Sequence, residues 1–303
     1  MVANGSGSVI FAKVQHLAQT YQQTRAQLEA SLSPMFGLGE ARALTWHLLE
    51  ATSGQTKTAL MARMHLIVPV ATAAMLAQSA SRVLAGEPVQ YVTGVVYFGG
   101  LRLRIGPGAL IPRPETEQLV AEVAAYRKQH MAPAPIQVVD VCTGSGCMAL
   151  YYKTLCPADD VVGLDISPEA LHWARLNATE TGLDVRFTQG NALHPNTLPG
   201  GPAGLIMSNP PYVPARDLTS LAPNVREHEP HLALFVPDND PLLFYRNLAA
   251  YACQVLAPDG LLAVETYAAY AQEVADLFEA NGLVSSIKED FAGRPRFVWA
   301  RPK

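Results

Sequence analysis

The chain has 303 residues, of which 49% are hydrophobic and 16% charged, and its formal net charge at pH 7 is −4. This composition suits a soluble globular protein of about two domains, and the mildly acidic balance provides no overall attraction to nucleic acid or to an anionic membrane surface. The opening MVANGSGSVI has no basic residue and no long apolar run, so we expect no signal peptide, and the four cysteines show no CxxC spacing, which favours reduced thiols in the cytoplasm.

Residues 1–88 are expected to form a small helical domain. Apolar side chains at helical spacing predict helices over residues 11–31, 40–51 and 71–85, and the first of these should end at the SLSP turn. The most apolar segment, IVPVATAAMLA, is interrupted by Pro69 and is much shorter than the ~20 residues of a membrane span. No strand pattern or catalytic cluster occurs here, so a helical bundle is the default interpretation and partner binding is the alternative.

Residues 89–113 have a different pattern and are expected to form a hairpin linker. The run VVYFGGLRLRI places two β-rich segments around Gly99 and Gly100, which predicts a two-residue hairpin turn. Over residues 114–303, predicted strands and helices alternate. The expected helices are 115–129, 147–155, 168–181, 241–257 and 269–281, and the expected strands are 137–141, 161–165, 185–189, 204–208, 261–265, 285–288 and 297–300. Such alternation predicts a parallel sheet covered by helices on both faces, with the last two strands forming an antiparallel hairpin on it.

A glycine-containing turn joins the first of these strands to its helix. In VVDVCTGSGCMAL, Gly144 and Gly146 allow close approach of a ligand to the backbone, and the N-terminus of the next helix favours a carboxylate or phosphate. One strand further on, VVGLD ends in Asp165, which can accept hydrogen bonds from ribose hydroxyls. The alternative is a purely structural turn with a helix-capping Asp. The turn and the acid together favour a ligand that contains adenosine.

The spacing of the glycines disfavours a dinucleotide. A GxGxxG motif needs three glycines, whereas CTGSGC supplies two. Asp140, at the end of the first strand, is suited to face an ammonium group. A ligand that combines ammonium, carboxylate and ribose is S-adenosylmethionine.

The stretch SNPPYVP at 208–214 follows a short apolar strand and cannot continue it, because proline fixes φ and has no N–H. Asn209 offers both a carbonyl acceptor and an NH₂ donor, Pro210 offers a carbonyl, and Tyr212 offers a flat apolar face. At the carboxyl edge of the sheet, these groups can hold a planar group that donates from an NH₂, either a carboxamide or an exocyclic amine.

Such a grip suits methyl transfer to a poor nitrogen nucleophile. The lone pair of an amide nitrogen is delocalised, so accurate placement matters, and positioning can contribute ~7–11 kcal/mol to lowering the barrier. Acceptors on the N–H groups also favour the nitrogen as positive charge develops. This chemistry needs no nucleophilic side chain, and we expect no metal site.

Seven stretches of the chain resemble the HemK/PrmC family, the release factor glutamine methyltransferases. They are GEPVQYVTG, LIPRPETEQLV, DVCTGSG, LDISPEAL, SNPPYVP, REHEPHLAL and AGRPRFVWAR. The resemblance covers roughly the last two thirds of the chain. NPPY alone is shared with DNA adenine methyltransferases, whereas PRPETE together with NPPY is much more specific.

The resemblance implies methylation of the side-chain nitrogen of the glutamine in the GGQ motif of peptide chain release factors. It implies an α/β fold, a Rossmann-like class I S-adenosylmethionine-dependent methyltransferase with a seven-stranded sheet (114–303), behind the hairpin linker (89–113) and a helical domain (1–88) that recognises the substrate protein. It further implies a cytoplasmic enzyme that acts as a monomer and binds neither membrane nor nucleic acid directly.

The resemblance also assigns site residues. The positions that match cofactor contacts are Asp140, Cys142, Thr143, Gly144, Ser145, Gly146, Asp165, Asn191, Ala192 and Asn209, and those that match the catalytic glutamine pocket are Asn209, Pro210, Pro211 and Tyr212. Two of these depart from the family pattern. Cys142 stands where a glycine is usual, and Asn191 stands where an acid usually meets the adenine.

Three alternatives stay open. Cysteine also stands at position 142 in the sister enzymes that methylate a ribosomal protein, although PRPETE and GRPR favour release factors. The NPPY grip would also accept a flipped adenine, as in an adenine-amino methyltransferase acting on nucleic acid. The third alternative is a binding protein without turnover.

Several other residues have two interpretations. Residues 113–117 either close over the cofactor or begin a helix. His228 lies either in a solvated loop or at the substrate entrance. We expect Cys142, Cys147, Met148 and Trp173 to be packing residues.

Overall fold

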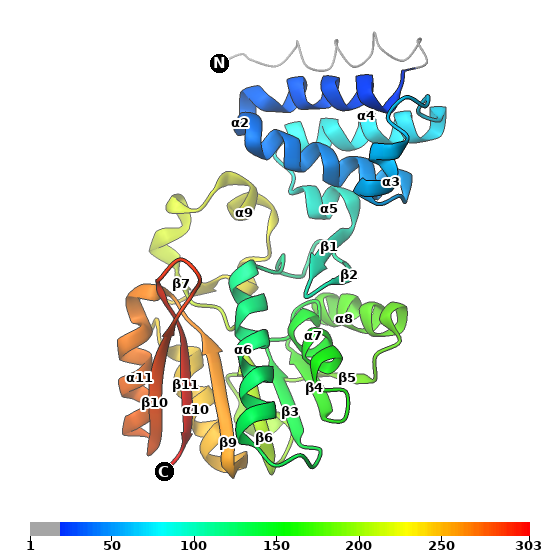
Figure 1. Ribbon diagram of the computed structural model, residues 1–303. Coiled ribbons are helices and arrows are strands. Elements are labelled where there is room, and N and C mark those ends of the chain that lie inside the picture. The colour runs from blue at the N-terminus through cyan, green and yellow to red at the C-terminus, as the bar shows by residue number, and fades with distance from the viewer. Residues whose placement is uncertain (1–18) are drawn as a thin grey trace. The chain divides into compact units, whose positions relative to one another are not determined.

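The computed structural model describes residues 19–303, and the chain divides into two compact units between Val95 and Val96 (Figure 1). This division falls inside the predicted linker 89–113. The predicted domain borders at residues 88 and 113 stay predictions. The two units are described separately below.

The first unit is helical, as predicted. Its helices within residues 19–95 are α2 (Tyr21–Ser53), α3 (Lys57–Ala62), α4 (Val70–Leu84) and α5 (Val89–Thr93). Thr20 begins α2 with a capping box, because its hydroxyl accepts from the Gln23 N–H while the Gln23 side chain accepts from the Thr20 N–H. Buried leucines from α2, α3 and α4 form the core of this unit, among them Leu28, Leu48, Leu60 and Leu76.

The predicted end of the first helix at the SLSP turn is wrong. The first helix continues through Pro34 to a kink at Gly37, whose φ is 74°, so that α2 consists of two helical segments, the second of which contains the predicted helix 40–51. The hydroxyl of Ser31 donates to a carbonyl four residues earlier, so it stays within the helix, and Leu32 is buried in the core of the unit. Core packing therefore overrides a local turn signal. The part of the predicted helix over residues 11–18 lies outside the described residues.

The second unit contains the predicted hairpin and sheet. Strands β1 (Val95–Phe98) and β2 (Leu101–Arg104) pair around Gly99 and Gly100, whose φ angles of 56° and 76° suit the predicted two-residue turn. The large sheet within residues 96–303 has seven strands in the order β10-β11-β9-β6-β3-β4-β5 (Figure 1). Its strands are β3 (Gln137–Val141), β4 (Asp160–Asp165), β5 (Val185–Gln189), β6 (Ala203–Ser208), β9 (Leu256–Glu265), β10 (Leu283–Glu289) and β11 (Pro295–Pro302).

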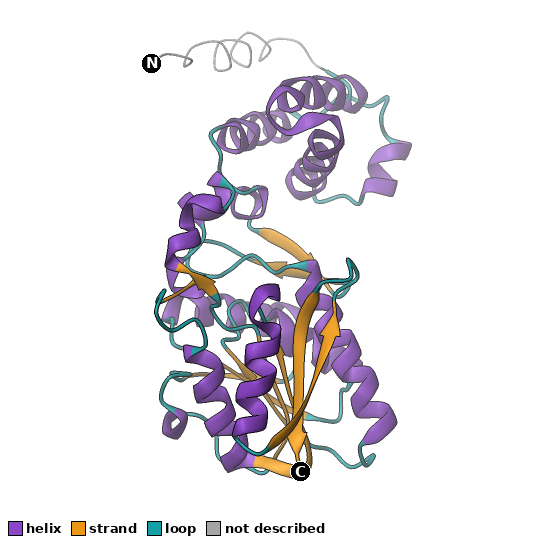
Figure 2. Ribbon diagram, turned by 90° about the vertical axis from the view of Figure 1, so that its left-hand side faces the viewer, coloured by secondary structure: helices purple, strands orange, loops and turns teal. Residues whose placement is uncertain are grey.

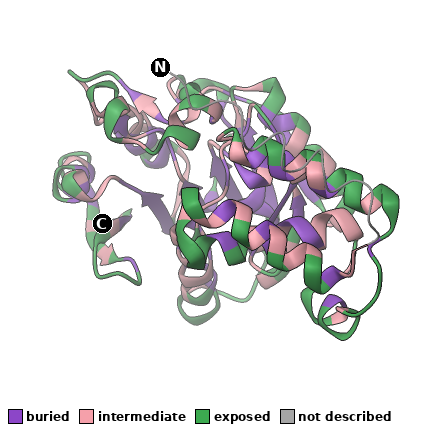
Figure 3. Cartoon of the chain, turned by 90° about the horizontal axis from the view of Figure 1, so that it is seen from above, coloured by how far each residue is buried: buried purple, intermediate pink, exposed green. Residues whose placement is uncertain are grey.

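The pairing matches the prediction. Strands β3, β4, β5, β6 and β9 are parallel, and β11 runs antiparallel to both β9 and β10. Helices lie on both sides of the sheet (Figure 2). They are α6 (Pro114–His130), α7 (Cys147–Leu155), α8 (Pro168–Thr181), α10 (Leu243–Val255) and α11 (Ala271–Ala280). The central strands β3 and β6 are almost entirely buried between these layers (Figure 3), whereas the edge strands β5 and β10 have exposed residues.

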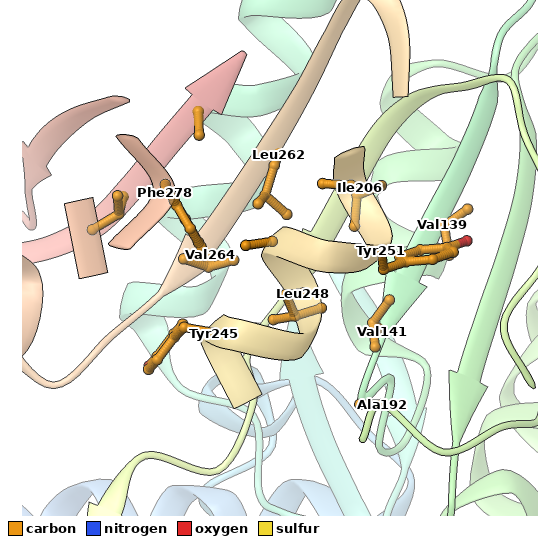
Figure 4. Packing of buried hydrophobic residues seen from close by; sticks show 14 of the residues in the cluster. Val139, Val141, Ala192, Ile206, Tyr245, Leu248, Tyr251, Leu262, Val264 and Phe278 are labelled. Carbon is orange, nitrogen blue, oxygen red and sulfur yellow. The ribbon is translucent and has the colours of Figure 1, made fainter. Parts of the chain in front are cut away.

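Alternate strand residues build one side of the core. Val139 and Val141 of β3, Ile206 of β6 and Leu262 of β9 share a cluster with side chains from α10 and α11, among them Leu248 (Figure 4). A strand places alternate residues on opposite faces, so the intervening positions face the other helical layer. The polar residues of the predicted site lie at the ends of the strands, outside this packed core.

Between β6 and α10 the chain forms an insertion that sequence patterns did not predict. It contains β7 (Val213–Pro214), the 3₁₀ turn η2 (Ala215–Ser220), α9 (Pro223–His228), the 3₁₀ turn η3 (His231–Ala233) and β8 (Phe235–Val236), with β7 and β8 paired in parallel. Within residues 19–303, no helix has both the length and the apolar character needed to cross a membrane.

Gly146 is the residue of the turn that packing constrains most. It caps α7 at φ 80°, and an added Cβ would lie 2.7 Å from Cζ of Phe187. We expect Gly146→Ala to lower the free energy of unfolding by about 2–4 kcal/mol, from left-handed strain and overpacking together. Urea unfolding of the whole chain measures the change.

Gly200→Ala is the matched control. An added Cβ at Gly200 meets no heavy atom of the described chain within 4 Å, so its effect should stay within about 0.5 kcal/mol. If the two variants were equally stable, the Gly146 site would be looser than its contacts indicate.

Candidate functional site

A cavity of about 300 Å³ lies at the carboxyl edge of the parallel strands. Its wall includes Cys142 and Gly144 after β3, Asp165 at the end of β4, Asn191 after β5 and Asn209 after β6. The segments 108–110 and 230–233 contribute further lining residues. The chain crosses over from one side of β3 to the other at this point, where open α/β sheets bind ligands.

The predicted glycine turn and the predicted acid contact each other directly. The Gly144 N–H donates to Oδ2 of Asp165 at 2.9 Å, and the Ser167 N–H donates to Oδ1 at 2.9 Å. Burial raises the pKa of Asp165, and these N–H groups partly offset that rise. A carboxylate has about four acceptor positions, so Asp165 keeps capacity for two more donors, as a ribose diol would require.

The two glycines of the turn have different surroundings. Gly144 lines the cavity at φ 56°, and an added Cβ meets no heavy atom within 4 Å among residues 19–303. A side chain there would fit the protein but would extend into the space open to a ligand. Gly146 instead has Phe187 and Ala174 against it and does not line the cavity. The first glycine is therefore open to a ligand, whereas the second is enclosed by the fold.

Asp140 lies beneath the turn and is fully buried. Its Oδ2 accepts from the Thr143 hydroxyl at 2.6 Å and from the Ala149 N–H at 3.1 Å, which ties the turn to the first helical residues of α7. Its Oδ1 is buried with no hydrogen-bond partner among residues 19–303. Burial raises the pKa of Asp140 to about 7. Asp140 is not part of the cavity wall, so its predicted contact with an ammonium stays a prediction, although an unpaired buried oxygen fits such a partner.

Cys142 has an unusual backbone conformation. Its φ of 63° is the only positive φ of a non-glycine residue among residues 19–303. The partly buried side chain packs against the core, and burial raises the pKa of the thiol well above its usual value. The thiol is thus a protonated packing group, as predicted, in a conformation that glycine adopts without strain.

The remaining predicted cofactor residues fall into two sets. Asn191 and Ala192 line the cavity, and the Asn191 side-chain oxygen accepts from the Leu193 N–H at 2.9 Å, which shapes the loop after β5. Thr143 and Ser145 are buried within the turn and are not part of the wall. They support the backbone that the ligand would meet.

The NPPY residues follow β6 at the same edge. Asn209 and Pro211 line the cavity, whereas Pro210 and Tyr212 are not among its lining residues. The Asn209 Nδ2 donates to the Thr116 hydroxyl at 3.1 Å, and this hydroxyl donates to Oε2 of Glu265 at 2.6 Å. The Tyr212 hydroxyl donates to Oε1 of Glu265 at 3.0 Å. Glu265 is 1% exposed, and burial raises its pKa.

Sequence reasoning missed Thr116 and Glu265. Glu265 ends the predicted strand LLAVE, an apolar run that closes on an acid at the edge that also carries Asn209. Thr116 lies in PRPETE and could have been noticed only as part of that motif. The residues around Thr116 and those around Glu265 form no sequence pattern that indicates a contact between the two.

The other candidates have mainly structural surroundings. Arg113 caps α6, which Pro114 begins, and its guanidinium pairs with Glu229 at 2.5 Å. Glu229 also accepts from the Ile111 N–H at 3.1 Å, which links the segment before α6 to the end of α9. Residues 113–117 thus begin a helix and do not line the cavity. His228 is the last residue of α9 and also lies outside the wall.

The other predicted packing residues contact the protein and not the cavity. Cys147 and Met148 are buried in the core, and the Trp173 indole N–H donates to the Pro107 carbonyl at 3.2 Å. None of the three lines the cavity.

The seven-stranded sheet, the glycine turn and its acid define a class I methyltransferase. Two family descriptions match the chain, "PrmC N-terminal domain" over residues 19–94 and "Methyltransferase domain" over residues 138–228. A relative from Deinococcus radiodurans named release factor glutamine methyltransferase is 39% identical over 254 residues, which cover 84% of this chain and 88% of that protein. A relative of the same name from Bradyrhizobium diazoefficiens is 38% identical over 285 residues, which cover 93% and 95%. The chain belongs to the release factor glutamine methyltransferase family.

The conformation of Cys142 leads to a test of stability. Cys142→Gly removes left-handed strain of about 1–2 kcal/mol and loses a similar amount of thiol burial, so its free energy of unfolding should stay within about 1 kcal/mol of wild type. Cys142→Ala loses the thiol but keeps the strain, so we expect it to be the less stable variant. Denaturant unfolding ranks the two. An alanine variant more stable than the glycine variant would contradict this account.

Proposed function

We propose that the protein transfers a methyl group from S-adenosylmethionine to the side-chain amide nitrogen of the glutamine in the GGQ motif of peptide chain release factors. The observation that carries the proposal is the place of Asn209, which lines the cavity beside the glycine turn while its NH₂ is held by Thr116. The names of the relatives support the substrate.

The cofactor would be held by groups at the ends of three strands. The turn at Gly144 and the N-terminus of α7 suit its carboxylate, Asp140 its ammonium and Asp165 its ribose. The loop that contains Asn191 and Ala192 suits the adenine end. When bound, S-adenosylmethionine supplies an electrophilic methyl group on a positively charged sulfur.

The chain's contribution to the reaction is to position the substrate amide. Asn209 and the Pro210 carbonyl accept from the amide NH₂, and Pro211 and the Tyr212 ring limit its movement. Because two consecutive prolines fix the backbone, little conformational freedom is lost when the amide is bound. Acceptors on both N–H bonds favour the nitrogen as it gains positive charge, without a metal or covalent step through a side chain.

A release factor as substrate also has implications for the role of the helical unit, the location of the enzyme and its partners. The helical unit, which the family description matches over residues 19–94, would recognise the release factor. A partner of the translation machinery would place the enzyme in the cytoplasm. The enzyme would act as a monomer, and its net charge of −4 supports binding to protein and not directly to nucleic acid.

Asn209→Ala tests the proposed grip. Loss of the amide acceptor should lower kcat with the GGQ protein by about 100-fold or more, while the affinity for S-adenosylmethionine and the melting temperature change little. Transfer of labelled methyl into purified release factor measures turnover, and calorimetry measures cofactor affinity. Asn224→Ala, an exposed asparagine of α9, is the matched control and should keep wild-type turnover.

The substrate arm of the experiment uses a release factor whose GGQ glutamine is replaced by glutamate, together with duplex DNA. Neither should accept methyl, since the glutamate has no NH₂ to donate and a chain of net charge −4 has no overall attraction to DNA. If either accepted methyl as fast as the GGQ protein, the glutamine assignment would be wrong.

Asp140→Asn tests the ammonium contact. One asparagine oxygen can accept from both Thr143 and Ala149, as Oδ2 of Asp140 does, and the NH₂ then replaces the unpaired Oδ1. A donor in place of an acceptor should weaken S-adenosylmethionine binding about tenfold. Unchanged affinity would restrict Asp140 to supporting the turn.

Stability gives the same variant a second readout. The pKa of Asp140 is raised from 3.8 to about 7, so folded protein retains a proton that unfolded protein has lost between these values. Wild-type stability should therefore fall as pH rises from about 4 to 7 and then level off. Asp140→Asn lacks this term, so its stability relative to wild type should rise by about 2–4 kcal/mol across that window. Identical pH slopes in the two proteins would show that Asp140 does not titrate there.

A further inference from the structure

The sheet brings Asn209 and Glu265 to the same edge, where Thr116 connects them. Strands β6 and β9 are neighbours, with Ser208 beside Val264, so the next residues of each strand, Asn209 and Glu265, emerge together at the carboxyl edge. Thr116, in the first turn of α6, stands between them and bonds to both. Three segments far apart in the chain therefore meet in one hydrogen-bonded row.

The direction of these hydrogen bonds follows from the donors available. An ionised carboxylate can only accept, and a threonine hydroxyl has one proton to give. In the ionised form of Glu265, which Arg296 and the two hydroxyl donors favour, the 2.6 Å contact uses that proton, so the Thr116 oxygen can only accept from Asn209. The group of Asn209 that faces Thr116 must then be its NH₂, and its carbonyl oxygen is directed elsewhere. Among residues 19–303, that oxygen has no hydrogen-bond partner.

We propose that Glu265, acting through Thr116, is a positioning residue that fixes the orientation of the Asn209 amide, so that a carbonyl oxygen and not an NH₂ meets the amide of the substrate. The inference rests on the proposed function, because it concerns the same pocket. Without the row, the two ends of the Asn209 amide differ little in shape, and rotation by half a turn would present a donor to a donor.

The same row sets what the pocket rejects. A glutamine NH₂ donates to the Asn209 oxygen, whereas a glutamate carboxylate would bring a second acceptor against it and leave both unpaired. The hydrogen bonds that end on a carboxylate also polarise the Asn209 carbonyl, which strengthens it as an acceptor while the substrate nitrogen gains positive charge.

Glu265 also holds the side chain of Tyr212. Its second oxygen accepts from the Tyr212 hydroxyl, and the Tyr212 ring stacks against Tyr267 with centroids 6.3 Å apart. One buried carboxylate therefore orients both the acceptor and the aromatic face. Nearby charge bears on its state, since Arg296 favours the ionised form and Glu115 opposes it.

Thr116→Val and Thr116→Ser separate this role from packing. Valine keeps the shape of threonine without the hydroxyl, so kcat with the GGQ protein should fall about tenfold or more, while KM and the affinity for S-adenosylmethionine stay within about threefold. Serine keeps the hydroxyl and should recover most of the loss. Thr179→Val, which removes an exposed threonine hydroxyl on α8, is the matched control and should keep wild-type kcat.

The Asn209 amide itself gives a readout that does not depend on turnover. In asparagine-labelled protein, the ¹⁵N side-chain signal of Asn209, assigned from its loss in Asn209→Ala, should move in Thr116→Val and stay in place in Thr116→Ser. If wild type does not methylate the GGQ protein, the proposed function fails, and this signal alone then decides the inference.

Two results would overturn the inference. One is a kcat of Thr116→Val within about threefold of wild type. The other is an equal loss in Thr116→Ser, which would trace the effect to packing. If Thr116→Val does not fold, Glu265→Gln carries the same test, because its single carbonyl oxygen cannot replace both carboxylate oxygens, and a wild-type kcat in that variant would equally overturn the inference.

Discussion

A carboxylate buried at the end of a β-strand needs hydrogen-bond donors, and this requirement shapes the carboxyl edge of the sheet. Asp140 takes its donors from a threonine and the first turn of the next helix. Asp165 takes them from backbone N–H groups of two loops, and Glu265 takes them from two side-chain hydroxyls. An ionised group left without donors would be costly to bury. The hydrogen bonds to each carboxylate therefore hold the neighbouring loop or helix in place. The glycine turn and the amide pocket therefore depend on the same constraint.

Much of this edge could be predicted because its signals are local. The glycines of the turn, the acid one strand later and the NPPY residues each follow an apolar run, and parallel strands bring such ends together. The hairpin at Gly99 and Gly100 and the alternation of strands and helices are equally local. Local sequence pattern could not distinguish the two glycines of the turn. Gly144 is open to a ligand, whereas Gly146 is enclosed by Phe187.

The features that escaped prediction depend on distant partners. Thr116 and Glu265 are separated by 149 positions in the chain, and nothing near either residue indicates the other. The continuation of α2 through the SLSP segment depends on leucines packed against other helices of its unit, which outweigh the turn signal of serine and proline. The left-handed backbone of Cys142 was likewise hidden, since only the resemblance to a glycine position indicated it.

The contacts of Glu229 have a kinetic consequence. This buried carboxylate joins Arg113 and the Ile111 N–H, and thereby links the 108–110 wall of the cavity to the 230–233 wall. Separating the two walls breaks an ion pair whose carboxylate is buried and, in the same event, a hydrogen bond from a backbone donor. Any movement that opens the cavity between these two walls must therefore break both contacts of Glu229, which raises the barrier to that opening.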